Sequence, residues 1–203
     1  AKSERRTPLA IAAEMADAII TNDNATGISD NIGGRAAYDP VTKSISVFEN
    51  NKVVRLAGGS ADDPNIYYLT GISLTGNNCD LVVQPPGEVV VYLEGDFIVN
   101  NSGSVNVSGT PFNFKVFQRG GNILFDNAGT IHAAIFAPFS NIVVRNTFEM
   151  GGSLVGNNVT MRNSGTFYYD EDLGRRQNRI HDVTVYGWLE VAATDAAPVG
   201  ATP

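Results

Sequence analysis

Three charged side chains occupy the same position of a repeated pattern and are the first candidates for chemistry. Asp126, Arg145 and Arg162 each follow a short apolar run, so we expect them to line up on one outer face of a β-structure. One acid beside two bases suits a polysaccharide lyase site or a sugar or anion contact. It suits equally a solvated row of ion pairs, each worth about 0–1 kcal/mol. We favour the row of ion pairs, because no catalytic set converges there.

The other titratable residues also fail to form a catalytic or metal-binding set. His132 and His181 are far apart in the sequence, whereas a zinc site needs three or four ligands. The acidic residues 170–172 lack the alternating spacing of a calcium loop and are expected to end the repeats. No Gly-x-Ser-x-Gly motif and no phosphate-binding loop occurs. We therefore predict a protein that is not an enzyme and that binds no metal or cofactor.

Composition narrows the choice of partners. The chain has 203 residues, of which only 17% are charged, and its net charge is −7. Nucleic-acid binding is excluded because no basic footprint is present. No stretch reaches the about 20 apolar residues of a transmembrane helix. Asn, Ser, Thr and Gly must therefore cover most of the surface, as in turn-rich β-proteins.

The first residues suggest export. The chain begins Ala1-Lys2-Ser3 without a methionine, which is typical either of a processed mature end or of an artificial boundary. If the end is processed, the protein has left the cytoplasm. We therefore expect an extracellular or cell-surface location.

The middle of the chain carries an internal repeat. Residues 122–131, 141–150 and 158–167 align without gaps. Each copy follows the same ten-position pattern. In order, the positions hold Asn, an aliphatic residue, any residue, an apolar residue, a charged residue, Asn, a small residue, any two residues and an apolar residue. Residues 96–105 form a fourth copy, and a weaker fifth copy begins at Gly71. Apolar segments between the copies are expected to be second strands.

One such unit cannot bury its apolar face alone, but stacked units pair their backbones and share a core. Asn suits the corner of each unit because it tolerates the left-handed conformation. The pattern therefore predicts an all-β fold, a β-solenoid (β-helix) of about five coils. An antiparallel sandwich of many short strands is the alternative. The repeat also predicts a column of stacked asparagines: Asn101, Asn127, Asn146 and Asn163.

The residues before the repeat suggest a helix and a hairpin. Residues 7–21 carry a helical apolar stripe that includes Leu9, Ile19 and Ile20. This short N-terminal α-helix either caps the core or docks on a neighbour. Two apolar runs within residues 43–56 flank a polar turn and predict a β-hairpin.

The residues after the repeat suggest an extension strand. Residues 180–191 contain an alternating pair, Val183 and Val185, followed by Trp188 and Leu189. We expect this C-terminal strand to reach a neighbouring subunit. The predicted organisation is thus residues 1–64 as the helix and hairpin region, 65–173 as the solenoid, and 174–203 as the C-terminal strand and tail.

Residues 87–173 resemble a known β-solenoid family of bacterial envelope proteins. The resemblance lies in residues 90–97, 134–138 and 152–156, and in the closing Tyr168-Tyr169-Asp170-Glu171. Members of that family often follow a pilin-like or type IV pilus assembly membrane anchor, and their architecture is similar to that of bactofilins. The resemblance implies an exported, surface-exposed structural or adhesive role without catalysis.

These observations lead to two functional hypotheses. The first is an exported structural subunit of an extracellular filament, pilus-like appendage or surface layer. Such a subunit would form a homo-oligomer through β-strand and edge contacts. The second is a monomeric surface adhesin or carbohydrate-binding module whose partner is a surface glycan.

Overall fold

A computed structural model describes residues 28–30, 37–85, 87–171 and 173 of the protein. The predicted N-terminal helix over residues 7–21 and the predicted strand over residues 180–191 lie outside these residues. The described elements are strands and one short 3-10 helix. Among the described residues, no helix has the length and apolarity needed to cross a membrane.

The strands follow one another closely along the chain. Their bounds are β1 (Ile28–Asp30), β2 (Tyr38–Asp39), β3 (Ser44–Val47), β4 (Val53–Ala57), β5 (Asn65–Leu69), β6 (Gly71–Leu74), β7 (Asp80–Gln84), β8 (Val89–Leu93), β9 (Phe97–Asn100), β10 (Ser104–Val105), β11 (Phe114–Gln118), β12 (Asn122–Asp126), β13 (Thr130–Arg145), β14 (Phe148–Arg162) and β15 (Gly165–Tyr169). The 3-10 helix η2 (Pro111–Asn113) precedes β11.

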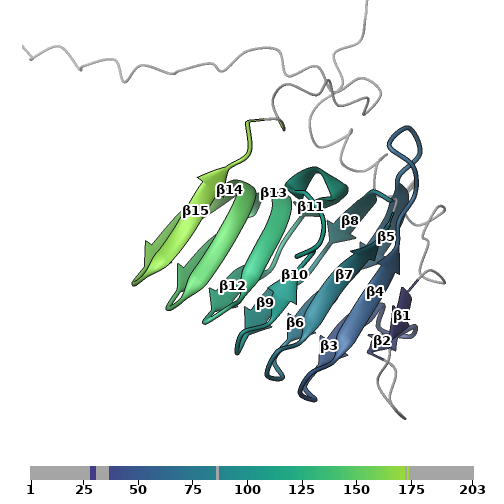
Figure 1. Cartoon of the computed structure of the whole chain (residues 1–203), viewed down its shortest axis with the longest axis horizontal. Helices are drawn as coiled ribbons and strands as arrows, with labels where there is room; N and C mark the ends of the chain where they lie inside the picture. Colours follow the sequence, from purple (N-terminus) through teal and green to yellow (C-terminus); the bar gives the residue numbers. More distant parts are fainter. Residues whose placement is uncertain (1–27, 31–36, 86, 172, 174–203) are drawn as a thin grey trace, which may run out of the picture.

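The all-β prediction is correct, but the predicted β-solenoid of about five coils is wrong. All the described strands belong to one 15-stranded sheet that curls around its own core. Figure 1 shows β15 at one end and β1 and β2 at the other, beyond β4 and β3, with β5, β8 and β11 turned behind the front strands. The sheet is mixed, because β1 pairs with β4 and β2 with β3 in antiparallel orientation. A repeat predicts parallel neighbours, but it does not predict these antiparallel additions.

The predicted hairpin within residues 43–56 is also wrong. β3 pairs with β2 and β6, whereas β4 pairs with β1 and β7, so β3 and β4 do not pair with each other. The turn between them joins two separate parts of the sheet. Since β3 and β4 stack in parallel on β6 and β7, the sheet also continues across the predicted domain boundary at residue 64.

The predicted register of the repeat is confirmed. Asn122 is paired with Asn141, and Asn141 with Asn158, with no shift along the four residues that follow. The same parallel register carries alternate residues of each strand into the core, where Ile123 and Phe125 of one strand and Ile142 and Val144 of the next are fully buried. Phe97 and Phe125 meet edge to face on neighbouring strands, with ring centroids 5.3 Å apart. Stacked apolar columns of this kind hold the sheet together.

Candidate association site at the open end of the sheet

The apolar columns of the core stop abruptly at the C-terminal end of the sheet. Val159 and Met161 lie in register on Ile142 and Val144. Ile142 and Val144 are completely buried, whereas Val159 is 40% exposed and Met161 is 44% exposed. The two side chains continue the core but have no described strand above them. We call residues 153–162 and 165–169 the open end.

The backbone at the open end also lacks partners on one side within the described chain. β15 pairs only with β14, over Phe148 to Gly152. After Tyr169, the amide of Asp170 donates to the carbonyl of Gly152 at 3.2 Å, and the amide of Leu173 donates to the carbonyl of Asp170 at 3.2 Å. Residues 153–156 therefore pair with β13 and with no later described strand. Unpaired strand edges of this kind can accept further strands.

At the opposite end, two of the three outermost strands are covered by further strands, while β5 pairs only with β8. The short strands β1 and β2 lie antiparallel on β4 and β3. The core residues of this first layer are buried, with Ile45 and Val47 at 1% exposure. The two ends of the described sheet therefore differ, and the C-terminal one exposes both core side chains and backbone.

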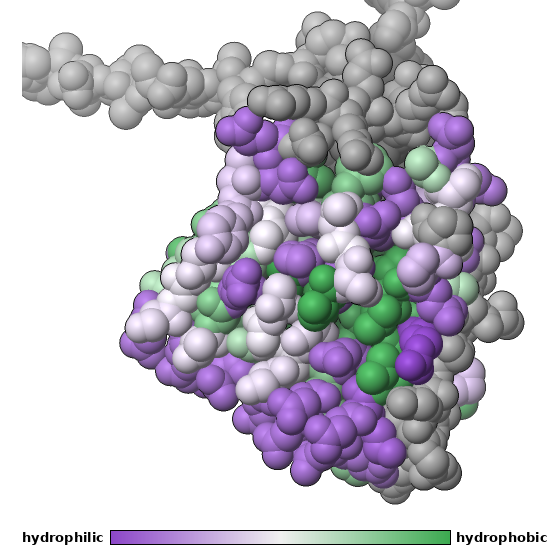
Figure 2. Space-filling view, in the orientation of Figure 1, coloured by the Kyte–Doolittle hydropathy of each residue, from purple (hydrophilic) through white to green (hydrophobic). Residues whose placement is uncertain are grey.

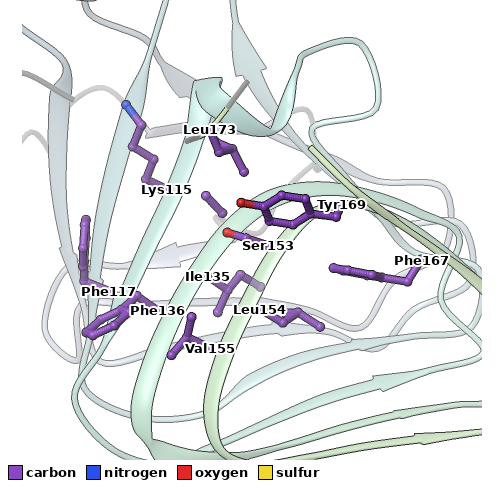
Figure 3. Close-up of a pocket in the computed structure, with 11 residues that line it drawn as sticks. Lys115, Phe117, Ile135, Phe136, Ser153, Leu154, Val155, Phe167, Tyr169 and Leu173 are labelled. Atoms are coloured by element: carbon purple, nitrogen blue, oxygen red, sulfur yellow. The ribbon is translucent and has the colours of Figure 1, made fainter. Parts of the chain in front are cut away.

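An apolar cavity of about 410 Å³ lies beside residues 153–156. It opens on the side formed by β11, β13 and β14, and Figure 3 shows the side chains around it. Its wall is formed by Lys115, Phe117, Ala134, Ile135, Phe136, Ser153, Leu154, Val155, Phe167, Tyr169 and Leu173. The cavity thus offers mainly apolar contact, with few polar groups.

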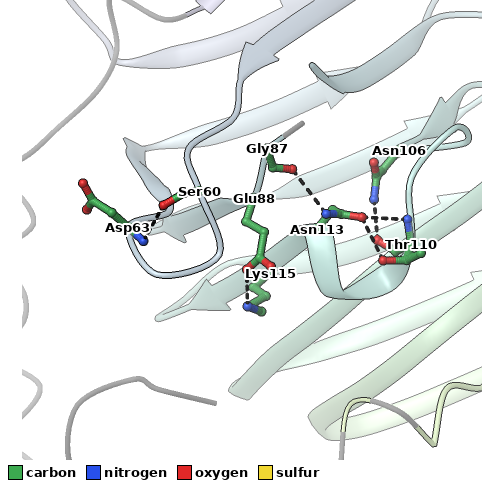
Figure 4. Close-up of polar contacts among 8 residues, drawn as sticks. All are labelled: Ser60, Asp63, Gly87, Glu88, Asn106, Thr110, Asn113 and Lys115. Atoms are coloured by element: carbon green, nitrogen blue, oxygen red, sulfur yellow. Dashed lines mark hydrogen bonds and ion pairs between the residues drawn. The ribbon is translucent and has the colours of Figure 1, made fainter. Parts of the chain in front are cut away.

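The one charged side chain in that wall is already neutralised. The ammonium of Lys115 lies 3.0 Å from a carboxylate oxygen of Glu88, and both residues are buried. The same ammonium lies 3.7 Å from the ring centroid of Phe112 in η2. Asn113 fixes this 3-10 helix by donating to the carbonyl of Gly87 (Figure 4). The pair therefore stabilises the wall and leaves little charge for a ligand.

An outward-facing column of aromatic rings leads to the cavity. Its members, Tyr68, Tyr92, Phe117 and Phe136, occupy one register position on successive strands, and Val155 takes that position on the last strand. The Tyr92 and Phe117 rings stack with centroids 5.5 Å apart and planes 23° apart. Their faces contact each other, so a sugar would meet mainly ring edges. Burial raises the pKa of Tyr68 to about 12, and the hydrogen bond to Glu94 and the negative charge of Glu94 contribute to the increase.

The predicted asparagine column lies at the turns along one edge of the sheet. Asn101, Asn127, Asn146 and Asn163 all have left-handed backbones, with φ between 52° and 68°. Asn163 donates to the side-chain oxygen of Asn146 at 2.8 Å, and Asn146 donates to Asp126. Figure 2 shows a strongly hydrophilic lower edge, where these turns lie in Figure 1.

Two further asparagines were missed by the repeat alignment. Asn51 and Asn78 also have positive φ angles, of 56° and 52°, and the Asn78 amide donates to the Asn51 side chain at 3.2 Å. The residues that precede these two turns differ from the repeat pattern, so the alignment did not include them. The doublets Asn50-Asn51, Asn77-Asn78 and Asn100-Asn101 were the signal that could have found them.

The charged residues of the repeat form an ion pair and no catalytic set. Asp126 and Arg145 are in register on neighbouring strands, and their side chains meet at 2.7 Å. Arg162 is in register beyond Arg145. His132 contacts the Gly109 carbonyl at 2.9 Å, while His181 lies outside the described residues. Within the described chain, no three potential metal ligands come together.

The residues predicted to mediate assembly fall outside the part of the chain that the structure describes. They are Leu9, Ile19, Ile20, Val183, Val185, Trp188 and Leu189. The open end that the structure does describe consists of other residues, from β14 and β15. The sequence alone did not single out Val159 and Met161, because in the repeat they look like ordinary core positions.

Comparison with known proteins assigns the chain to a family whose function is unknown. A family model described as Domain of unknown function (DUF7305) matches residues 42–176. This range contains every strand from β3 to β15. No curated protein and no solved structure matches the chain.

Proposed function

The chain belongs to the DUF7305 family, a domain of unknown function, and from its geometry we propose that it is a structural subunit that associates through its open end. The assembly would be an extracellular filament, pilus-like appendage or surface layer. The extracellular location is supported by the resemblance of residues 87–173 to bacterial envelope proteins. The site of association is supported by the structure of β14 and β15.

The observation that carries this proposal is the exposure of core side chains at one end only. Val159 and Met161 are 40% and 44% exposed although they continue fully buried columns. Fully burying a side chain of this size is worth about 1.5–3 kcal/mol, so covering the exposed part of each would contribute about 1 kcal/mol. The adjacent unpaired backbone adds hydrogen bonds when another strand is laid along it.

A second copy of this chain is the partner that best fits the open end. Residues 158–169 contain a single charged residue, Arg162. In a protein with a net charge of −7, this segment is therefore free of the acidic repulsion that opposes self-association. A filament requires the open end to contact a different surface of the next copy, because a contact between two open ends would close as a dimer.

Sedimentation velocity over a range of protein concentrations tests this proposal. We expect the wild-type protein to form larger species as its concentration rises. The double variant Val159→Lys/Met161→Lys should remain monomeric, because two ammonium groups would have to be buried in the contact. The matched control is Val41→Lys/Val107→Lys, which adds the same charge at positions 89% and 47% exposed.

Circular dichroism and urea unfolding would first confirm that each variant is folded. The control should associate like the wild type. A wild-type protein that stays monomeric throughout would contradict the proposal, and so would equal association of the open-end variant. Electron microscopy of the associated species would then separate filaments from closed dimers.

A further inference from the structure

The cavity beside residues 153–156 lies where one strand of the sheet is missing from the described chain. Earlier in the chain, β4, β7 and β10 are equivalent strands, and each is followed by a strand on the rear part of the sheet: β4 by β5, β7 by β8, and β10 by β11. The connections from β7 to β8 and from β10 to β11 comprise residues 85–88 and 106–113. After β15, the described residues contain no corresponding strand along residues 153–156.

The described chain ends at this position. Leu173 is the last described residue, and its side chain is part of the cavity wall. Figure 3 shows Leu173 and Tyr169 above Ser153, with Phe117 and Phe136 on the far side of the cavity. Thirty residues follow Leu173 in the sequence. They include the alternating Val183 and Val185 and the tryptophan Trp188.

We propose that this cavity is the docking site for residues 180–191 of the same chain. This segment supplies the missing strand along residues 153–156, where one of Val183 and Val185 extends the apolar column that stops at Leu154 and the other packs beside it on the same face. Trp188 packs against the apolar wall of the cavity. The inference goes beyond the proposed association: it fills residues 153–156 of the open end from the same chain and leaves residues 158–162 and 165–169 for contact with a second copy.

The short distance to the site favours the same chain over a second copy. Residues 174–179 separate Leu173 from the segment, and six extended residues span about 20 Å. The segment therefore begins within reach of residues 153–156. A tether this short gives the segment an effective concentration in the millimolar range, which a second copy reaches only in very concentrated solution. The connection needed, residues 170–179, is similar in length to residues 106–113.

The intrinsic fluorescence of Trp188 provides the test, because it is the only tryptophan in the chain. In the wild-type protein we expect blue-shifted emission and weak acrylamide quenching, both independent of protein concentration. Val155→Lys, which places a charge in the cavity wall, should red-shift the emission and increase quenching. Val107→Lys is the matched control, since Val107 is 47% exposed, Val155 is 43% exposed, and only Val155 lines the cavity.

A second variant tests the proposal even if Val155→Lys fails to fold. Trp188→Ala alters only the docking segment, so amide hydrogen exchange in residues 153–156 should become faster while exchange in residues 141–145 stays the same. Wild-type emission as red-shifted as in urea, or no effect of Val155→Lys and Trp188→Ala, would overturn the proposal. Burial of Trp188 that appears only at high concentration would overturn it in favour of docking between copies.

Discussion

The left-handed backbone at Asn127 gives a prediction whose size can be worked out from the structure. Asn127 has φ 52°, a conformation in which a Cβ atom costs a typical residue about 1–2 kcal/mol. Asparagine tolerates this conformation better than alanine does, and glycine adopts it without steric cost. We therefore expect Asn127→Ala to lower the free energy of unfolding by about 1 kcal/mol, whereas Asn127→Gly should change it much less, because glycine meets no steric penalty in this conformation.

A glycine variant at Asn146 separates backbone strain from side-chain hydrogen bonding. Asn146 has φ 63°, but its side chain also donates to Asp126 and accepts from Asn163. Replacing it with glycine removes both hydrogen bonds, each worth about 0.5–1.5 kcal/mol and near the lower limit at an exposed site. Asn146→Gly should therefore destabilise the protein, unlike Asn127→Gly.

Urea unfolding followed by circular dichroism measures these differences. With an m-value of about 2 kcal/mol/M, a loss of 1 kcal/mol moves the midpoint by about 0.5 M. The order of stability should be wild type and Asn127→Gly together, then Asn127→Ala and Asn146→Gly. If the alanine and glycine variants at position 127 unfold together, the left-handed backbone does not explain the asparagine. If Asn146→Gly matches the wild type, the side-chain hydrogen bonds contribute nothing.

Two further predictions come from single close contacts. A Cβ atom at Gly165 would lie 1.9 Å from Cε1 of Phe148, so Gly165→Ala should lower the free energy of unfolding by about 1–3 kcal/mol through overpacking. The added change Phe148→Leu should recover part of that loss, and strict additivity would contradict the predicted clash. The pKa of Tyr68 is raised to about 12 by burial and by Glu94, so Glu94→Gln should lower it in an ultraviolet absorbance titration, with Tyr68→Phe identifying the signal. Because this pKa lies above the unfolded value of about 10, stability should fall as pH rises from about 10 to about 12, and an unchanged titration in Glu94→Gln would refute the role of the carboxylate.

The repeat made the register of the C-terminal strands predictable. Ile123, Ile142 and Val159 align without gaps in the sequence, and the structure pairs them in that order. Parallel neighbours of this kind place equivalent residues side by side, so a sequence alignment is also a structural alignment. The turn asparagines follow from the same alignment, because few other residues adopt a left-handed backbone at low cost.

The partners of β3 and β4 could not be predicted in the same way. The polar turn at residues 49–52 shows that the chain bends, but it does not show which strand pairs with which. β3 pairs with β6, and β4 pairs with β7, in each case about one repeat later in the sequence. On their other sides, β3 pairs with the antiparallel strand β2 and β4 with the antiparallel strand β1. These choices depend on the burial of Ile45 and Val54 in a common core. Local patterns do not contain that information.

The open end could not be predicted either, because it is defined by what lies above a residue. In the sequence, Val159 and Met161 are equivalent to the buried Ile142 and Val144. The structure separates them only through the absence of a described strand beyond β14 and β15. The aromatic column was missed for a related reason, since Tyr92, Phe117 and Phe136 stand between the aligned segments.

Hydrogen exchange at low and high protein concentration tests the central claim, association through the open end, most directly. If subunits associate there, amides in residues 158–162 and 165–169 should exchange more slowly as concentration rises, because the edge becomes paired and covered. Amides in the interior strands β9 and β12 should keep the same rate. Equal rates for residues 158–169 at both concentrations, in a sample shown to contain associated species, would place the contact elsewhere and contradict the account.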